Sequence, residues 1–137
     1  MSYLDDPNFD DVCTGLFEGN VIAEIRKVDV DYVSSGKGTK GIQCFMFIES
    51  EGKKYDREKW GDPSGLTMNY TMWEPHQGMA DGGNFSKRAM KEFVEALEIP
   101  SKDPREWVGQ KVVLRCKITS SEGYDDKTDV KKVLKLR

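Results

Sequence analysis

The sequence lacks any long apolar stretch, and none of its apolar runs approaches the roughly 20 residues that a membrane-spanning helix needs. Residues 1–7 contain neither the basic start nor the apolar segment of a signal peptide. We therefore expect no membrane segment and no secretion. The expected location of the protein is the cytoplasm, which is the host cytoplasm if the protein is viral.

Cysteine is scarce and scattered, since the chain has only Cys13, Cys44 and Cys116. A disulfide scaffold in a short secreted chain normally shows an even and dense set of cysteines. We therefore expect three reduced thiols, with Cys44 and Cys116 as small core residues. A zinc site takes four ligands at short spacings, and the sequence has no C-x-x-C pair, so no metal is expected.

Candidate catalytic groups are also few. His76 is the only histidine, and it lies in a loop rich in glycine and proline without a paired nucleophile nearby in sequence. Segment 36–41 is similar in composition to a phosphate-binding loop, but it lacks the first glycine at the required spacing and precedes an expected strand rather than a helix. We therefore expect no enzymatic activity and no cofactor. The segment is interpreted as a basic hairpin loop that closes over a phosphate backbone through Lys37 and Lys40.

Length, composition and charge indicate one globular domain that follows an acidic, loosely ordered N-terminal arm. The chain has 137 residues, of which 37% are hydrophobic and 33% charged, which suits a single domain with a solvated surface. Its net charge is −3, but residues 1–20 hold five acidic side chains and no lysine or arginine. The remaining domain, 21–137, carries 21 basic and 19 acidic side chains. This balance is compatible with nucleic-acid binding.

Hydrophobic periodicity predicts several strands and one main helix. Segment 21–33 alternates as a strand but changes parity near Arg26-Lys27, which predicts a β-bulge there. The helix follows Asn84, carries an apolar stripe through Leu97 and ends before Pro100. The other expected strands are 42–50, 54–60, 66–73, 110–119 and 130–137, with one further helical turn at 103–107.

The order of these elements predicts an all-β domain with one main helix. An OB-type five-stranded barrel places its helix between the third and fourth strands, and a long bent first strand suits such a barrel. The alternative is an open α+β sheet with the helix packed on one face.

The strand at 42–50 carries the most informative pattern. One face is wholly apolar, and the opposite face includes Phe45 and Phe47. Two outward phenylalanines are costly unless something covers them, and the N-terminal arm, another subunit or stacked nucleobases would each do so. In the alternative interpretation, both rings form a second core layer.

Basic and aromatic residues accompany this face in the sequence. Tyr55, Arg57 and Lys59 share one parity of the expected strand 54–60, and Arg115 and Lys117 are outward on 110–119. Single-strand binding needs this mixture of π-faces for bases and cations for phosphates, although an ordinary solvated surface would show the same cations. Trp60, Trp73 and Trp107 each suit a core lid, and in an alternative interpretation Trp73 and Tyr70 extend the stacking surface. The predicted nucleic-acid-binding set is Phe45, Phe47, Tyr55, Arg57, Lys59, Lys37, Lys40, Arg115 and Lys117.

Several segments also occur in the order found in a known family. A Gly/Lys loop (34–41) precedes an apolar strand and a lysine-rich segment that ends at Trp60 (53–60). The pattern Arg88-x-x-Lys91-x-Phe93-x-x-Ala96-Leu97-x-Ile99 follows, and then come Trp107-Val108-Gly109-Gln110-Lys111-Val112 and Gly123-Tyr124. Over roughly residues 15–137 the chain resembles the small phage-encoded OB-fold proteins of viral replication and recombination genes, several of which bind single-stranded DNA.

The resemblance implies an OB-fold and single-strand binding that is largely independent of sequence. One departure is the basic end of the chain, 131–137, where many single-strand binders carry an acidic tail that recruits partners. The leading hypothesis is therefore a non-enzymatic protein of phage-type DNA replication or recombination that binds single-stranded DNA, with RNA as an open alternative. The second hypothesis is a protein-interaction module that self-associates, as a homodimer, through Phe45 and Phe47.

Overall fold

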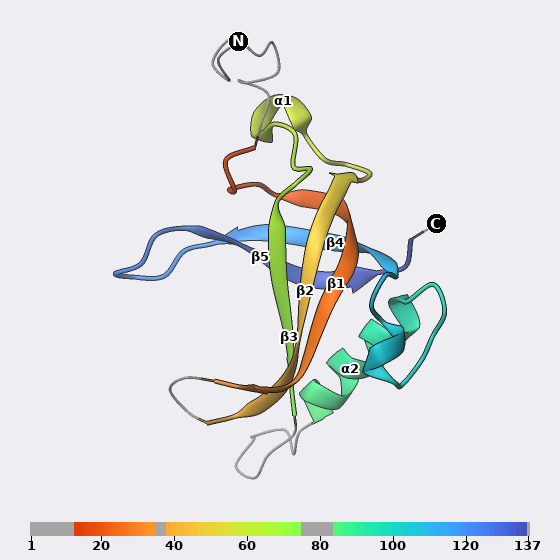
Figure 1. Ribbon diagram of the computed structural model, residues 1–137. Coiled ribbons are helices and arrows are strands. Elements are labelled where there is room, and N and C mark those ends of the chain that lie inside the picture. The colour runs from red at the N-terminus through yellow and green to blue at the C-terminus, as the bar shows by residue number, and fades with distance from the viewer. Residues whose placement is uncertain (1–12, 35–37, 75–83, 137) are drawn as a thin grey trace, which may run out of the picture.

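The computed structural model describes residues 13–34, 38–74 and 84–136, and within them the chain forms one antiparallel sheet with short helical segments (Figure 1). The strands are β1 (Gly19–Val33), β2 (Lys40–Glu51), β3 (Thr67–Trp73), β4 (Lys111–Thr119) and β5 (Lys127–Leu134). The helical segments are α1 (Arg57–Trp60), α2 (Asn84–Ala96) and the 3₁₀ turn η3 (Pro104–Glu106). An all-β domain with one main helix, as predicted, is confirmed.

The long strand β1 joins the two halves of the sheet. It pairs with β2 along nearly its whole length and with β4 through residues Gly19 to Glu24, which gives the strand order β3-β2-β1-β4-β5. The helix α2 lies between β3 and β4 in the chain, as expected. The sheet is not closed, because β3 and β5 are its edges in the part of the chain that the structure describes. The predicted closed barrel is therefore not observed in the described residues, because the sheet remains open between β3 and β5.

The predicted bulge in β1 is present. Ile25 pairs with Met46 and Lys27 pairs with Phe45, so Arg26 is an extra residue opposite the β2 ladder. A β-bulge of this kind bends its strand and lets two consecutive side chains emerge on the same side. This is the physical reason for the parity change seen in the sequence.

The expected strand at 54–60 is wrong. Asp56 caps α1 instead, since its Oδ1 accepts a hydrogen bond from the backbone N of Lys59 at 3.1 Å. Lys54 has a φ of 65°, and a Cβ on Gly52 would lie 2.9 Å from the carbonyl oxygen of Asn20. The segment therefore turns sharply and cannot continue a ladder. The third strand is β3, which starts one residue after the expected strand 66–73 and ends with it.

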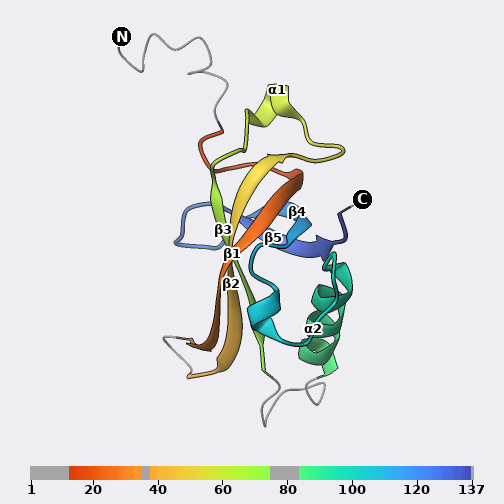
Figure 2. The same cartoon turned by 45° about the vertical axis from the view of Figure 1, so that its right-hand side comes forward.

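The core fills the inner face of the curled sheet and the side that α2 covers. Phe93 and Leu97 are buried on α2, and the ring of Phe93 contacts those of Tyr70 and Trp107, with centroid distances of 6.1 and 4.9 Å. The β1–β2 hairpin end and α2 lie at the same end of the molecule (Figure 2). All three cysteines are buried and free, so Cys44 and Cys116 are core residues as predicted.

The first described residues attach the chain to this body. Phe17 is fully buried, and its backbone N donates a hydrogen bond to the hydroxyl of Thr128 at 3.1 Å. The backbone N of Cys13 donates to the carbonyl oxygen of Asp62 at 3.0 Å. The acidic side chains of residues 1–12, like His76, lie outside the described residues.

Two further observations concern the described ranges only. None of their helices has the length and apolar character needed to cross a membrane. They also contain no group of three or more potential metal-ligating side chains.

Candidate nucleic-acid interface

Strand β2 places Phe45 and Phe47 on the outer face of the sheet. Their neighbours Cys44, Met46 and Ile48 are buried on the inner face, whereas both phenylalanines are only partly buried. Neither ring belongs to the hydrophobic core or packs against it. The prediction that both point outward from the strand is confirmed, and the alternative that they form a second core layer is not supported.

The bulge in β1 brings two cations over these rings. The guanidinium carbon of Arg26 lies 4.4 Å from the centroid of Phe47, and Nζ of Lys27 lies 5.6 Å from the centroid of Phe45. An exposed cation–π contact is worth about 0.5–1 kcal/mol. Arg26 also forms an ion pair with Glu24 at 2.6 Å. Both cations remain exposed, so they can turn toward an anion that approaches the outer face.

A second aromatic pair closes over the same strand at the hairpin end. Gly41 pairs with Tyr32 on one side and with Trp73 on the other. The two rings meet at a centroid distance of 5.7 Å and an interplanar angle of 43°. A Cβ on Gly41 would lie 2.8 Å from the carbonyl oxygen of Met72 and 3.0 Å from Cε3 of Trp73. The glycine therefore allows the close approach of the tryptophan.

These four rings form what we call the aromatic row: Tyr32, Trp73, Phe45 and Phe47. Gly41, Phe45 and Phe47 share one parity of β2, so the row follows the outer face of this strand over about 20 Å at roughly 3.4 Å per residue. No member belongs to the core or packs against it. A row of π-faces flanked by cations can stack bases and hold phosphates.

Three predicted site residues lie away from the row, because 54–60 is not a strand. Tyr55 packs against the core and its hydroxyl donates to the carbonyl oxygen of Gly61 at 2.6 Å. Arg57 forms an ion pair with Glu51 at 3.0 Å, and Nζ of Lys59 lies 4.7 Å from the ring centroid of Trp60. The prediction that Tyr55, Arg57 and Lys59 lie together on one face of a strand is therefore wrong.

The remaining predicted cations have different surroundings. Lys40 begins β2 at the hairpin end and is exposed, and Lys37 lies outside the described residues. Arg115 and Lys117 are exposed on β4, which is separated from β2 by β1. Lys117 pairs across the ladder with Asp129, whereas Arg115 pairs with Lys132.

Sequence reasoning missed Arg26, Lys27 and Tyr32 as members of the site. The two cations had a visible signal, since they stand at the parity change of the first strand. Tyr32 had none, because its contact with Trp73 depends on the register across Gly41. Tyr70, in contrast, stacks on Phe93 on the inner side, and burial raises the pKa of its hydroxyl.

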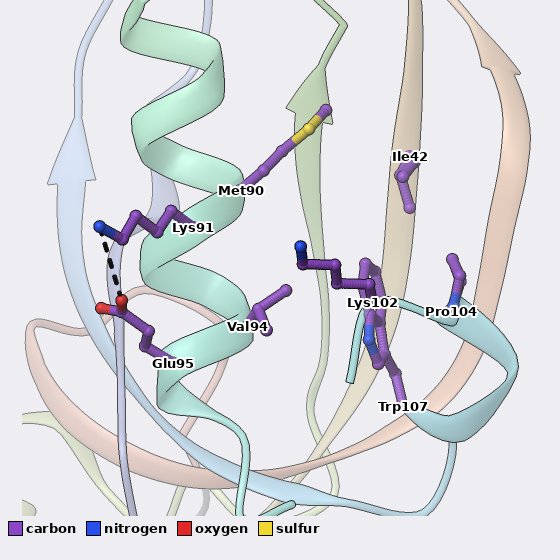
Figure 3. Close-up of a pocket in the computed structure, with 8 residues that line it drawn as sticks. All are labelled: Ile42, Met90, Lys91, Val94, Glu95, Lys102, Pro104 and Trp107. Carbon is purple, nitrogen blue, oxygen red and sulfur yellow. Dashed lines mark ion pairs between the residues drawn. The ribbon is translucent and has the colours of Figure 1, made fainter. Parts of the chain in front are cut away.

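A cavity lies on the inner side of the sheet, which α2 covers. It has a volume of about 540 Å³ and is lined by Met90 and Val94 of α2, by Trp107 and by Ile42 (Figure 3). Ile42 has the inner parity of β2, so this cavity opens away from the aromatic row. None of the predicted binding residues lines it.

Comparison with known proteins does not indicate a family or a ligand for this surface. No protein-family model matches the chain, and no curated protein is significantly similar to it in sequence.

Proposed function

We propose that this protein binds single-stranded DNA on the aromatic row, without sequence preference and without catalysis. One observation carries the proposal: four aromatic rings that contribute nothing to the core lie along one outer face, with Arg26 and Lys27 directly over two of them. Stacking on an aromatic side chain contributes roughly 1–3 kcal/mol per base and tolerates any base. Phosphate contacts by the flanking cations add a term that depends on salt.

We further propose that the domain is an OB-type barrel whose β3–β5 edge is left open. The strand order β3-β2-β1-β4-β5 and the position of α2 between β3 and β4 support this assignment. OB-folds bind oligonucleotides on the face around their second and third strands, and the aromatic row lies on β2 with Trp73 contributed by β3. A role in phage-type DNA replication or recombination is proposed on the family resemblance alone.

The test is a titration of the intact protein with oligo-dT, followed by tryptophan fluorescence at two salt concentrations. Stacking of a base on Trp73 should quench its emission, and the affinity should fall as salt rises. Trp73→Phe should remove most of the signal, because Trp107 is buried and Trp60 packs against the core.

A matched pair of variants connects the signal to the row. Phe47→Ala should weaken binding, whereas Tyr124→Ala should not, because Tyr124 is 81% exposed and lies outside the row. No binding at low salt, or equal losses in the two variants, contradicts the proposal. Loss of a dimer in Phe47→Ala with unchanged DNA affinity would instead assign the row to self-association.

A further inference from the structure

A second hollow lies on the outer face of the sheet, beyond the Phe47 end of the aromatic row. It has a volume of about 230 Å³. Its apolar lining comes from three strands and from Leu136, and its lining also includes two lysines, Asn20 and Gly52. The apolar residues are Ile22, Val113, Leu134 and Leu136, and the lysines are Lys53 and Lys135.

Strand register explains why this hollow exists. Ile22 of β1 pairs with Val113 of β4, and Val113 pairs with Leu134 of β5. These three apolar side chains therefore lie side by side across three strands on the outer face, and all three are partly exposed. An apolar floor open to solvent suits a flat apolar ligand.

A group of cations lies beside the hollow, one step along the same strands. Arg115 pairs directly with Lys132, and a register shift between Arg115 and Cys116 leaves Lys131 as an extra residue in β5. All three side chains are exposed. Like charges directly opposite each other in a ladder are destabilising. No ion pair joins any of the three to an acidic side chain within the described ranges.

The hollow and the aromatic row share one continuous surface. Glu24 of β1 pairs with Phe47 on one side and with Lys111 on the other. Ile22 is two residues further along β1, which corresponds to about 7 Å. Between them, Lys111 forms an ion pair with Glu49 at 3.0 Å.

We propose that this hollow is a second nucleotide site for the same DNA strand, with a base on Ile22, Val113 and Leu134 and the adjoining phosphates on Arg115, Lys132 and Lys135. The site rests on the proposed function, because it takes the strand that leaves the aromatic row at Phe47. Charge complementarity selects a polyanion as the ligand, and the apolar floor selects one that carries exposed bases. A duplex keeps its bases stacked inside and offers none to the hollow.

The experiment uses the full chain and oligo-dT of two lengths, about 4 and about 16 nucleotides, which are the limits of the usual site size per OB-fold. The test variant is Lys132→Gln with Lys135→Gln. Its matched control is Lys87→Gln with Lys102→Gln, which removes the same charge from α2 and from the segment after it. A second test variant, Val113→Phe, fills the hollow without changing the charge.

The site predicts that the test double variant lowers affinity for the long oligonucleotide about tenfold more than the control does. It should also reduce the salt slope by about 1.4, at roughly 0.7 for each phosphate contact on a single strand. Val113→Phe should also weaken binding of the long oligonucleotide. Neither test variant should change the affinity for the short oligonucleotide, and melting temperatures verify that each variant folds.

The contrary results separate the two proposals. Equal affinities of the test and control variants for the long strand, with Phe47→Ala still weakening both lengths, overturn the second site and keep the aromatic row. If the test double variant loses the same affinity for both lengths, its lysines act only through long-range electrostatic attraction, and this result also overturns the second site. Normal long-strand binding by Val113→Phe shows that the hollow holds no base. A wild-type protein that binds neither length overturns both proposals.

Discussion

The guanidinium of Arg26 lies 4.4 Å from the ring centroid of Phe47, and this contact joins the bulge of β1 to the outward face of β2. The same side chain forms an ion pair with Glu24. A cation held over an exposed ring is close to any phosphate whose base stacks beside that ring. The bulge and the row are therefore parts of one surface, and their contributions can be measured separately.

Neutralising the bulge cations should change the salt dependence of binding. Arg26→Gln and Lys27→Gln each remove one phosphate contact, so each should reduce the slope of log affinity against log salt by roughly 0.7. Titrations with oligo-dT at several salt concentrations measure this slope. Lys102→Gln, on the opposite side of the sheet, is the control and should leave it unchanged. Unaltered slopes in the two bulge variants would exclude Arg26 and Lys27 as phosphate contacts.

Truncating the two phenylalanines should affect binding more than folding. Phe45→Ala and Phe47→Ala should each weaken oligo-dT binding by roughly 1–3 kcal/mol for a lost stack. Their free energies of unfolding should change by much less than the roughly 3–5 kcal/mol expected for a buried phenylalanine. Phe93→Ala, which removes a ring only 1% exposed, supplies that comparison. Urea unfolding and oligo-dT titration of the same variants decide the matter, and collapse of the fold in Phe45→Ala would mean that this ring is structural.

Gly41→Ala should disturb the Tyr32–Trp73 pair. The new Cβ would lie 2.8 Å from the carbonyl oxygen of Met72, so backbone must move. Overpacking of this kind costs typically 1–3 kcal/mol, and we expect a lower melting temperature, a shifted tryptophan emission and weaker strand binding. Gly65→Ala is the control: its φ of 91° strains an alanine, but its Cβ would meet nothing within 4 Å. Its backbone N bonds to the carbonyl oxygen of Ile48, toward the other end of β2 from Gly41. Wild-type emission and affinity in Gly41→Ala would show that the pair does not matter for binding.

Stability should fall at alkaline pH because of two core thiols. Burial raises the pKa of Cys44 and that of Cys116 from 9.0 to about 12. A raised pKa in the folded state means that the unfolded chain loses its thiol protons first. Each thiol makes its full contribution to the free energy of unfolding below pH 9. This contribution is lost as the pH rises from about 9 to about 12. Urea unfolding at about pH 8 and at about pH 10.5, on either side of the unfolded thiol pKa, should show the decrease, and Cys44→Val should show less of it. Equal pH dependence in the variant would contradict this cause.

Removing the acidic residues ahead of Cys13 should strengthen binding at low salt. Deletion of 1–12 removes Asp5, Asp6, Asp10 and Asp11 and retains Phe17, which is buried. Fewer negative charges on a protein that binds DNA reduce its electrostatic repulsion of the strand, and added salt screens the difference. Affinities for oligo-dT at low and high salt measure the effect. An affinity that the deletion leaves unchanged at low salt would show that these residues do not influence the binding face.

The features that depend on one strand at a time could be predicted from the sequence. Alternation in β2 places Cys44 and Met46 inside and Phe45 and Phe47 outside, and the parity change of β1 indicates its bulge. Segment 54–60 also alternates, but the capping side chain of Asp56 and the positive φ of Lys54 outweigh that pattern.

Features that depend on the pairing of distant strands could not be predicted. Tyr32 and Trp73 are 41 positions apart and meet only because both pair with Gly41. The opposition of Arg115 and Lys132 depends likewise on a bulge in β5 that no alternation reveals, because Lys131 and Lys132 both suit a solvent-facing position.

The bulge at Arg26 has a consequence for how this surface can vary. A chain without residue 26 would have Ile25 inward, Lys27 outward and Val28 inward, which is plain strand alternation. The interior would keep every one of its side chains, while the outer face would lose one positive charge and the cover of Phe47. A change of one residue in length, rather than a substitution, would thus alter ligand affinity and leave the core intact.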